Sequence, residues 1–292
     1  MTTQSHHTST ALQPYGRMLS INGKQLNVYQ AGTGSDLVLL PGFGDLSQYY
    51  SHYYLIQSLA EHYRVTVIEP FGRGWSEVTD SPRNLTNLNH EIHQALTQLD
   101  VTHYVMVAHS ISGLYALDYV ARFQGEVRGI IGIDSSTPLV RHRTKQTYSQ
   151  LLTAKQAGKS PLPPLDYKQF GYSDALIQQY RLIADRQKYN ANLLDEAKHL
   201  SDNISQAACL RFPAGLPVLH LLAEDSVLNF SQIFGEKHTK GKSWVKEHLA
   251  LSENPADVRI KIIPGFHALA LCSHHAMLPE IIAFMSEIAS TN

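Results

Sequence analysis

The stretch VMVAHSISGLYA, Val105–Ala116, places two serines at the junction of two different sequence patterns. The run Tyr104–Ala108 is apolar and β-rich, which predicts a buried strand, and Ile111–Phe123 shows helical periodicity. A strand that turns sharply into a helix is typical of a parallel sheet covered by helices. The sequence must then show which serine, Ser110 or Ser112, occupies the turn.

Side-chain size around the turn favours Ser110. In a sharp strand–turn–helix elbow, the residues two positions before and two after the central serine must be small. Ala108 and Ser112 meet this requirement for Ser110, whereas Leu114 does not meet it for Ser112. Ser110 is thus the candidate nucleophile. The alternative is that this serine only caps the helix that follows it.

A serine hydroxyl becomes a good nucleophile when a histidine removes its proton and an acid orients that histidine. In the order typical of such elbows, the acid follows the nucleophile and the histidine comes last. Asp225 follows the predicted strand Val218–Ala223, and His267 follows the strand Arg259–Ile263 and a Pro-Gly turn. We therefore predict Ser110, Asp225 and His267 as the catalytic residues.

Other residues compete for two of these roles. Asp134 ends the predicted strand Gly129–Asp134, and Glu224 adjoins Asp225, so either could be the acid. His274 and His275 are alternatives to His267, but neither follows a glycine turn at a strand end. We favour Asp225 by its position in the chain.

The segment LVLLPGFGD, Leu37–Asp45, predicts an oxyanion hole. Gly42 and Gly44 allow the backbone to approach a substrate closely, so the N–H of Phe43 can point at a developing negative charge. The second donor is the N–H of Ile111, the residue after the nucleophile. A plain glycine-rich turn between strand and helix is the simpler alternative.

Short apolar runs alternate with helical patterns along most of the chain, which predicts a parallel sheet with helices on both faces. The remaining predicted strands are Gln25–Gln30, expected at an edge, Leu37–Leu40 and Val65–Glu69; the remaining predicted helices are Leu46–Glu61, Leu85–Leu99 and Pro279–Ala289. From 138 to 212 the strand signal vanishes. This segment contains Gly158, Pro161, Pro163 and Pro164 and predicts three helices, Thr144–Ala157, Ser173–Arg186 and Leu193–Ala207. We expect residues 1–137 and 213–292 to form the core domain and 138–212 a helical cap.

Composition excludes several classes of protein. The 292 residues are 43% hydrophobic and 17% charged, with a formal net charge of −1, so neither disorder nor a nucleic-acid partner is indicated. No secretory signal and no apolar run long enough to span a membrane is recognisable, so we expect a cytoplasmic protein. Cys209 and Cys272 are expected to be free thiols.

Motifs for bound metals or nucleotides are missing from the sequence. The histidine pairs His6–His7, His90 with His93, and His274–His275 lack zinc-site spacing. No Walker-type or dinucleotide-binding glycine loop occurs. We therefore expect neither a metal nor a cofactor, and the sequence predicts no particular oligomeric state.

From Leu19 to Ala289 the sequence resembles the α/β-hydrolase superfamily. The matching segments are SINGKQLNVYQAG, LLPGFG, VIEPFGRGWSE, AHSISG, AEDSV and PGFHALA. The resemblance implies an α/β-hydrolase fold with a mostly parallel sheet and a helical cap. One departure is Pro41, which replaces the family's usual histidine before the oxyanion glycine, so this loop must be supported by other residues.

The expected activity is hydrolysis of a carboxylic ester of small to medium size through an acyl-enzyme, by a serine hydrolase. One alternative is an aminopeptidase or amidase of the same fold, acting on a small-molecule amide. An amino terminus would call for acidic groups near the pocket, and the expected cap has few. The other alternative is a non-hydrolytic member that senses a ligand or acts as a lyase.

Overall fold

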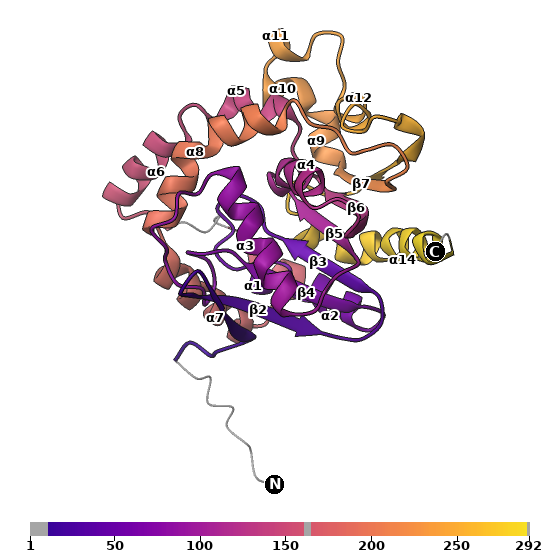
Figure 1. The fold of residues 1–292 in the computed structure, drawn as a ribbon. Coiled ribbons are helices and arrows are strands. Elements are labelled where there is room, and N and C mark those ends of the chain that lie inside the picture. The colour runs from indigo at the N-terminus through magenta and orange to yellow at the C-terminus, as the bar shows by residue number, and fades with distance from the viewer. Residues whose placement is uncertain (1–10, 161–164, 291–292) are drawn as a thin grey trace.

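A computed structural model describes residues 11–160 and 165–290 (Figure 1). The strands are β1 (Arg17–Ile21), β2 (Lys24–Ala31), β3 (Asp36–Leu40), β4 (Arg64–Glu69), β5 (Tyr104–His109), β6 (Val127–Ile133), β7 (Val218–Ala223) and β8 (Val258–Ile263). They form one sheet in the order β1-β2-β4-β3-β5-β6-β7-β8. Only the pairs β1–β2 and β2–β4 are antiparallel. The predicted α/β class with a mostly parallel sheet is confirmed.

The helices connect these strands. Before β7 they are α1 (Gln48–Ser51), α2 (Tyr53–Ala60), α3 (Leu85–Gln98), α4 (Ser112–Arg122), α5 (Arg141–Thr144), α6 (Thr147–Gln156), α7 (Asp174–Gln187) and α8 (Ala191–Ala207). After β7 they are α9 (Glu224–Leu228), α10 (Phe230–Phe234), α11 (Glu236–Thr239), α12 (Trp244–Leu249), α13 (Leu269–Cys272) and α14 (His274–Ser290). Short 3-10 turns occur at Pro138–Val140, Tyr167–Phe170 and Pro255–Asp257.

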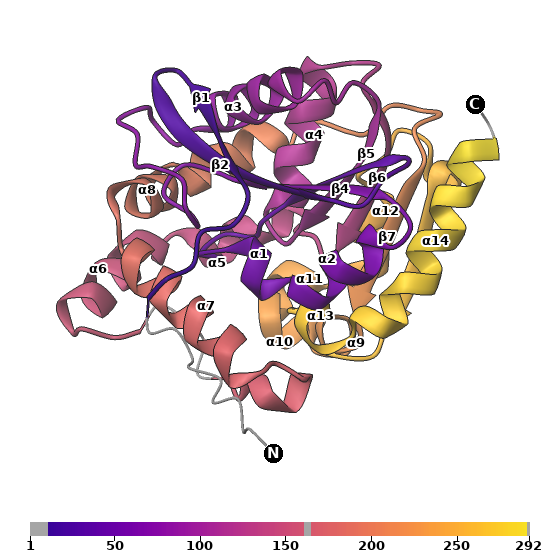
Figure 2. The same cartoon turned by 90° about the horizontal axis from the view of Figure 1, so that it is seen from below.

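Two apolar cores sandwich the sheet. On one face α3 and α4 pack through residues such as Leu88 and Leu117. On the other face α2 and α14 pack through residues such as Leu55 and Ile281. Figure 2 shows α3 and α4 on one side of the sheet and α2 and α14 on the other. Burial on both faces explains why β3 and β5 are almost entirely apolar.

The helices between β6 and β7 gather to one side of the sheet in both views (Figures 1 and 2). Side-chain caps define the starts of two of them. Ser173 accepts a hydrogen bond from the N–H of Leu176, and Asn190 accepts from Asn192 and Leu193. The three helices predicted in this segment correspond to α6, α7 and α8, whereas Pro161, Pro163 and Pro164 lie outside the described residues. That the segment forms a separate cap with the bounds 138–212 stays a prediction.

Several predicted elements need correction. The strand predicted at an edge is β2, which lies inside the sheet because the unpredicted β1 pairs with it around the Asn22–Gly23 turn. The predicted helix Leu46–Glu61 is divided into α1 and α2 at His52. The last helix starts at His274 and includes Pro279. The helices from α9 to α12 were not predicted.

Candidate active site

Strand register brings the candidate loops together at one edge of the sheet. Leu40 of β3 is paired with Ala108 of β5, and His109 is paired with Ile133 of β6. The residues that follow these strands are therefore neighbours, because the strands are parallel and end at the same edge. These residues are the Pro41–Asp45 loop, Ser110 and Asp134.

Ser110 occupies a sharp turn between β5 and α4. Its φ of 55° lies in the left-handed region, which is uncommon for a residue with a Cβ atom. Two backbone hydrogen bonds hold this conformation: the N–H of Ser110 donates to the carbonyl of Ile133 at 3.2 Å, and the N–H of Ser136 donates to the carbonyl of Ser110 at 2.7 Å. The neighbouring strand β6 and its end thus fix the turn.

His267 reaches Ser110 from the loop after β8. Its Nε2 lies 2.9 Å from Oγ of Ser110, which is hydrogen-bonding distance. Gly265, with a φ of 134°, lets the loop turn back towards the sheet. The two residues that the sequence pairs as nucleophile and base are therefore in contact.

Asp134, and not Asp225, contacts the histidine. Oδ2 of Asp134 lies 2.6 Å from Nδ1 of His267. Asp225 is exposed and accepts a hydrogen bond from Asn229, its neighbour one turn along the chain. The prediction of Asp225 as the residue that orients His267 is wrong, and Glu224 is likewise exposed. The reason is topological: Asp134 directly follows β6, which is the direct neighbour of β5 in the sheet.

The residues after β7 serve to hold Asp134. Its carboxylate accepts hydrogen bonds from the N–H of Ala223 at 3.0 Å, the hydroxyl of Ser226 at 2.7 Å and the indole N–H of Trp244 at 3.4 Å. Burial by itself would raise the pKa of Asp134, which is 1% exposed. The bonds from His267, Ser226 and Ala223, with the charge of His267, outweigh burial and lower the pKa below its ordinary value. The group is therefore a carboxylate at neutral pH.

His109 is a site residue that the sequence analysis missed. Its Nε2 lies 3.2 Å from the backbone carbonyl of His267, and the two ring centroids are 5.1 Å apart. It precedes Ser110, so it links the nucleophile turn to the histidine loop. The sequence feature that could have identified His109 is a polar aromatic residue directly before the serine of the elbow.

Arg73 supports the loop after β3, in which Pro41 replaces the family's usual histidine. Its guanidinium donates to the carbonyl of Gly42 at 2.8 Å and to the carbonyl of Asp45 at 2.6 Å, and it pairs with Glu196 of α8 at 2.6 Å. The hydroxyl of Ser112 donates to the carbonyl of Pro41. These contacts replace the structural role of the histidine that the sequence lacks.

Two backbone N–H groups beside Ser110 have no hydrogen-bond acceptor in the described part of the chain. Within residues 11–160 and 165–290, the N–H groups of Phe43 and Ile111 make no hydrogen bond. Both residues lie beside Ser110: Ile111 follows it, and Phe43 lines the same cavity. Free N–H groups near a nucleophile can stabilise a negatively charged oxygen.

The cavity that contains Ser110 and His267 has a volume of about 380 Å³. Apolar side chains form part of its wall, namely Phe43, Leu165, Ala270 and Leu271. Asp45, His52, Tyr167 and Tyr180 contribute polar groups. Its size and mixed lining suit a small organic molecule.

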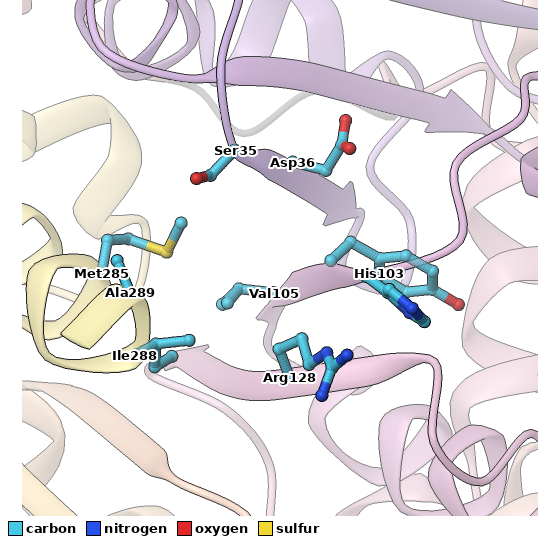
Figure 3. A pocket seen from close by; sticks show the side chains of 9 residues that line it. Ser35, Asp36, His103, Val105, Arg128, Met285, Ile288 and Ala289 are labelled. Carbon is cyan, nitrogen blue, oxygen red and sulfur yellow. The ribbon is translucent and has the colours of Figure 1, made fainter. Parts of the chain in front are cut away.

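A second hollow, of about 400 Å³, lies at the opposite edge of the sheet. Figure 3 shows Asp36, His103 and Arg128 at the starts of β3, β5 and β6, with Met285 and Ile288 of α14 on the other side of the hollow. It contains none of the residues around Ser110. Ligands of open α/β sheets bind at the carboxyl ends of the strands, so the cavity at Ser110 is the better candidate.

The remaining histidines do not assemble into a metal site. Among the described residues, no group of three His, Cys, Asp or Glu side chains could hold a metal ion. His93 pairs with Glu126, and His274 stacks on Tyr54. His6 and His7 lie outside the described residues. Cys209 and Cys272 are free thiols, as predicted.

No helix among the described residues is long and apolar enough to cross a membrane.

The fold and the elbow define a class of α/β proteins, and comparison with known proteins identifies it. The family model described as "alpha/beta hydrolase fold" matches residues 37–159. The uncharacterized protein YbdG of Bacillus subtilis (strain 168) is 25% identical over 98% of this chain and 90% of its own. The chain therefore has the α/β-hydrolase fold, and residues 37–159 match the model of that family.

Solved structures share this fold. The epoxide hydrolase VrEH1 from Vigna radiata has a TM-score of 0.68 at 16% identity, covering 93% of this chain and 97% of its own. A serine hydrolase involved in carbazole degradation, the CarC enzyme, has a TM-score of 0.63 at 18% identity. The match covers 92% of this chain and 98% of that of the CarC enzyme. At this level of identity the likeness concerns the fold.

Proposed function

We propose that the protein is a serine hydrolase that cleaves a carboxylic ester of small to medium size, with Ser110, His267 and Asp134 as its catalytic residues. The observation that carries the proposal is the unbroken chain of contacts from Oγ of Ser110 to Nε2 of His267 and from Nδ1 of His267 to Oδ2 of Asp134. This chain has the geometry of a nucleophile, a base and an orienting acid.

In the first step, Oγ of Ser110 attacks the ester carbonyl while Nε2 of His267 takes the hydroxyl proton. The Asp134 carboxylate accepts from Nδ1–H, so it fixes the tautomer that leaves Nε2 free to act as a base, and it stabilises the imidazolium that forms. The N–H groups of Phe43 and Ile111 hold the oxyanion, each contributing about 3 kcal/mol to the transition state. His267 then returns the proton to the leaving alcohol.

In the second step, His267 removes a proton from water, which attacks the acyl-enzyme carbonyl. The bond to Oγ of Ser110 breaks, the acid leaves, and Ser110 recovers its proton from His267. Every proton in this cycle passes through Nε2 of His267, and the chain's own residues suffice for it.

The test is the intact mass after incubation with a fluorophosphonate, for wild type and for Ser110→Ala. We expect one covalent adduct on the wild type and none on the variant, because only a serine activated by a base reacts. Turnover is then measured on a panel of 4-nitrophenyl esters and 4-nitroanilides. Absence of an adduct on folded wild type would contradict the proposal and favour a ligand-sensing role.

A further inference from the structure

The loop after β3 places one charged side chain in the wall of the cavity. Asp45 is the only Asp, Glu, Lys or Arg among the described residues that line it. The side chain is 9% exposed, and its carboxylate accepts hydrogen bonds from the hydroxyl of Ser51 at 2.7 Å and from the N–H of Ser47 at 3.3 Å. A carboxylate has about four lone-pair positions, so two donors leave it able to accept more.

The partners of His52 fix which of its nitrogens carries a proton. Ser51 gives its single proton to Asp45, so its oxygen accepts from Nδ1–H of His52 at 2.7 Å. Burial lowers the pKa of His52 well below its ordinary value, and the ring is neutral at pH 7. Its Nε2 is therefore a bare acceptor, and it is buried without a partner among the described residues.

His109 presents a second bare acceptor. Its Nε2–H donates to the carbonyl of His267, and burial lowers its pKa to about 4, so Nδ1 carries no proton at neutral pH. This Nδ1 also lacks a partner among the described residues. Both nitrogens are buried, and both rings are neutral at pH 7, so neither His52 nor His109 supplies a positive charge to Asp45.

The positive charge close to Asp45 is already matched. Arg73 donates to the backbone carbonyl of Asp45, not to its carboxylate, and its other amino group pairs with the buried carboxylate of Glu196. The basic side chain nearest to the Asp45 carboxylate is that of His52, whose Nδ1 lies 3.7 Å from Oδ2, and this ring is neutral at pH 7. Burial raises the pKa of Asp45, although the bond from Ser51 and the charge of Arg73 oppose the rise, and a cationic ligand would favour the charged form of this carboxyl group.

Aromatic rings complete the environment. Tyr167 and Tyr180 line the same cavity, with ring centroids 5.7 Å apart. Burial raises the pKa of Tyr167 to about 12, and the negative charge of Asp45 adds to the rise. Tyrosine rings beside a carboxylate attract ammonium groups.

We propose that Asp45 is a specificity-determining residue that receives an ammonium group of the substrate while Ser110 attacks its carbonyl. This inference rests on the proposed function, and it narrows the substrate to an ester that carries a protonated amine. The expected cap has few acidic groups near the pocket, whereas Asp45 lies in the loop after β3 and lines the same cavity as Ser110.

Two matched pairs of esters test the proposal, one for each side of the scissile bond. For the acyl side, 4-nitrophenyl 6-aminohexanoate is compared with 4-nitrophenyl heptanoate. For the leaving-group side, S-(2-dimethylaminoethyl) thiobutyrate is compared with S-(3-methylbutyl) thiobutyrate. The members of each pair have the same number of chain atoms and differ in charge. We expect wild type to favour the cation by about tenfold or more in kcat/KM within at least one pair.

The Asp45→Asn variant should lose that preference, because the amide keeps the size of the side chain but not its charge. The readout is the ratio of kcat/KM for the cationic ester to kcat/KM for the neutral ester of the same pair, which should fall towards one in this variant. The matched control is Asp185→Asn, which removes an exposed carboxylate paired with Lys188 and should keep the preference.

Three results would overturn the inference. Wild type could show no preference for the cation in either pair, or the preference could survive in Asp45→Asn. The third result is that 4-nitrophenyl 6-hydroxyhexanoate raises kcat/KM over the heptanoate as much as the aminohexanoate does. The last would mean that a donor without charge suffices. Fluorophosphonate labelling separates these results from failure of the proposed function. If wild type is not labelled, Asp45 can still be tested by binding. Calorimetry then compares the affinity of Ser110→Ala for hexylammonium with its affinity for 1-hexanol.

Discussion

Oδ2 of Asp134 lies 2.6 Å from Nδ1 of His267, although 133 residues separate the two in the chain. Asp225, which follows the next strand, lies on α9 with its side chain bonded to Asn229. The two aspartates therefore differ in what they can do for the histidine, and substitution distinguishes them.

We expect Asp134→Asn to lower kcat by about 10³- to 10⁴-fold and Asp225→Asn to change it by less than about threefold. The asparagine keeps the shape of the side chain but removes the charge and allows the wrong tautomer of His267. The measurement is steady-state hydrolysis of a 4-nitrophenyl ester, with near-ultraviolet circular dichroism to show that both variants fold. Equal losses in the two variants would contradict the assignment of the acid.

Arg73 should matter for both stability and rate. Arg73→Met leaves the buried Glu196 without its partner, so we expect the free energy of unfolding to fall by about 3–5 kcal/mol. It also frees the carbonyls of Gly42 and Asp45, which should loosen the oxyanion loop and lower kcat about tenfold or more.

The double variant Arg73→Met/Glu196→Gln separates these two effects. Removing the unpaired charge should restore much of the stability, measured by urea denaturation, while kcat stays low. A double variant that recovers kcat together with stability would mean that Arg73 acts only through the fold.

His109 should make the stability depend on pH. The unfolded chain protonates this residue below about pH 6.5, whereas burial delays protonation in the folded state to about pH 4. Between these values the unfolded state binds more protons, so stability falls as the pH falls, by an amount on the order of 1 to 3 kcal/mol. His109→Gln should show a shallower decline than wild type in urea titrations at pH 7.0, 5.5 and 4.5. Parallel curves would contradict the burial effect at this site.

Gly74 should tolerate no side chain. A Cβ atom there would lie 1.5 Å from Oε2 of Glu69, whose carboxylate is fully buried and accepts hydrogen bonds from Tyr15, Ser47 and Asn27. Gly74→Ala should therefore cost about 3 kcal/mol or more of unfolding free energy.

Gly125→Ala is the matched control for this substitution. Gly125 also has a positive φ, but its Cβ would meet nothing within 4 Å, so we expect a cost of about 1 kcal/mol. Thermal or urea denaturation gives both values. Similar costs for the two variants would mean that Glu69 and its partners move aside freely.

The sequence allowed local features of the site to be predicted, and the choice of acid required tertiary structure. Ser110 and His267 were identified because the size rule at the elbow and the glycine turn after β8 operate over a few residues. The acid could not be chosen in this way, because Asp134 and Asp225 both follow strands. What decides is that Asp134 adopts a φ of 37° and receives the N–H of Ala223 from the adjacent strand.

The same distinction explains the errors in the fold. Buried strands such as β3 and β5 have a strong apolar signal. The edge strand β1 is largely exposed, so its composition resembles that of a loop, and only its pairing with β2 reveals it. The four short helices from α9 to α12 have four to six residues each, too few to show a period.

The position of the acid directly after β6 has a consequence for how this chain can diverge. The stretch from β7 to β8 holds Asp134 through Ala223, Ser226 and Trp244 but contributes no residue to the proposed chemistry. Gly241, between α11 and α12, is exposed and has open space around it. Insertions at this tip leave the three supporting contacts in place, so this is where the chain can gain a new segment during evolution without remaking its active site.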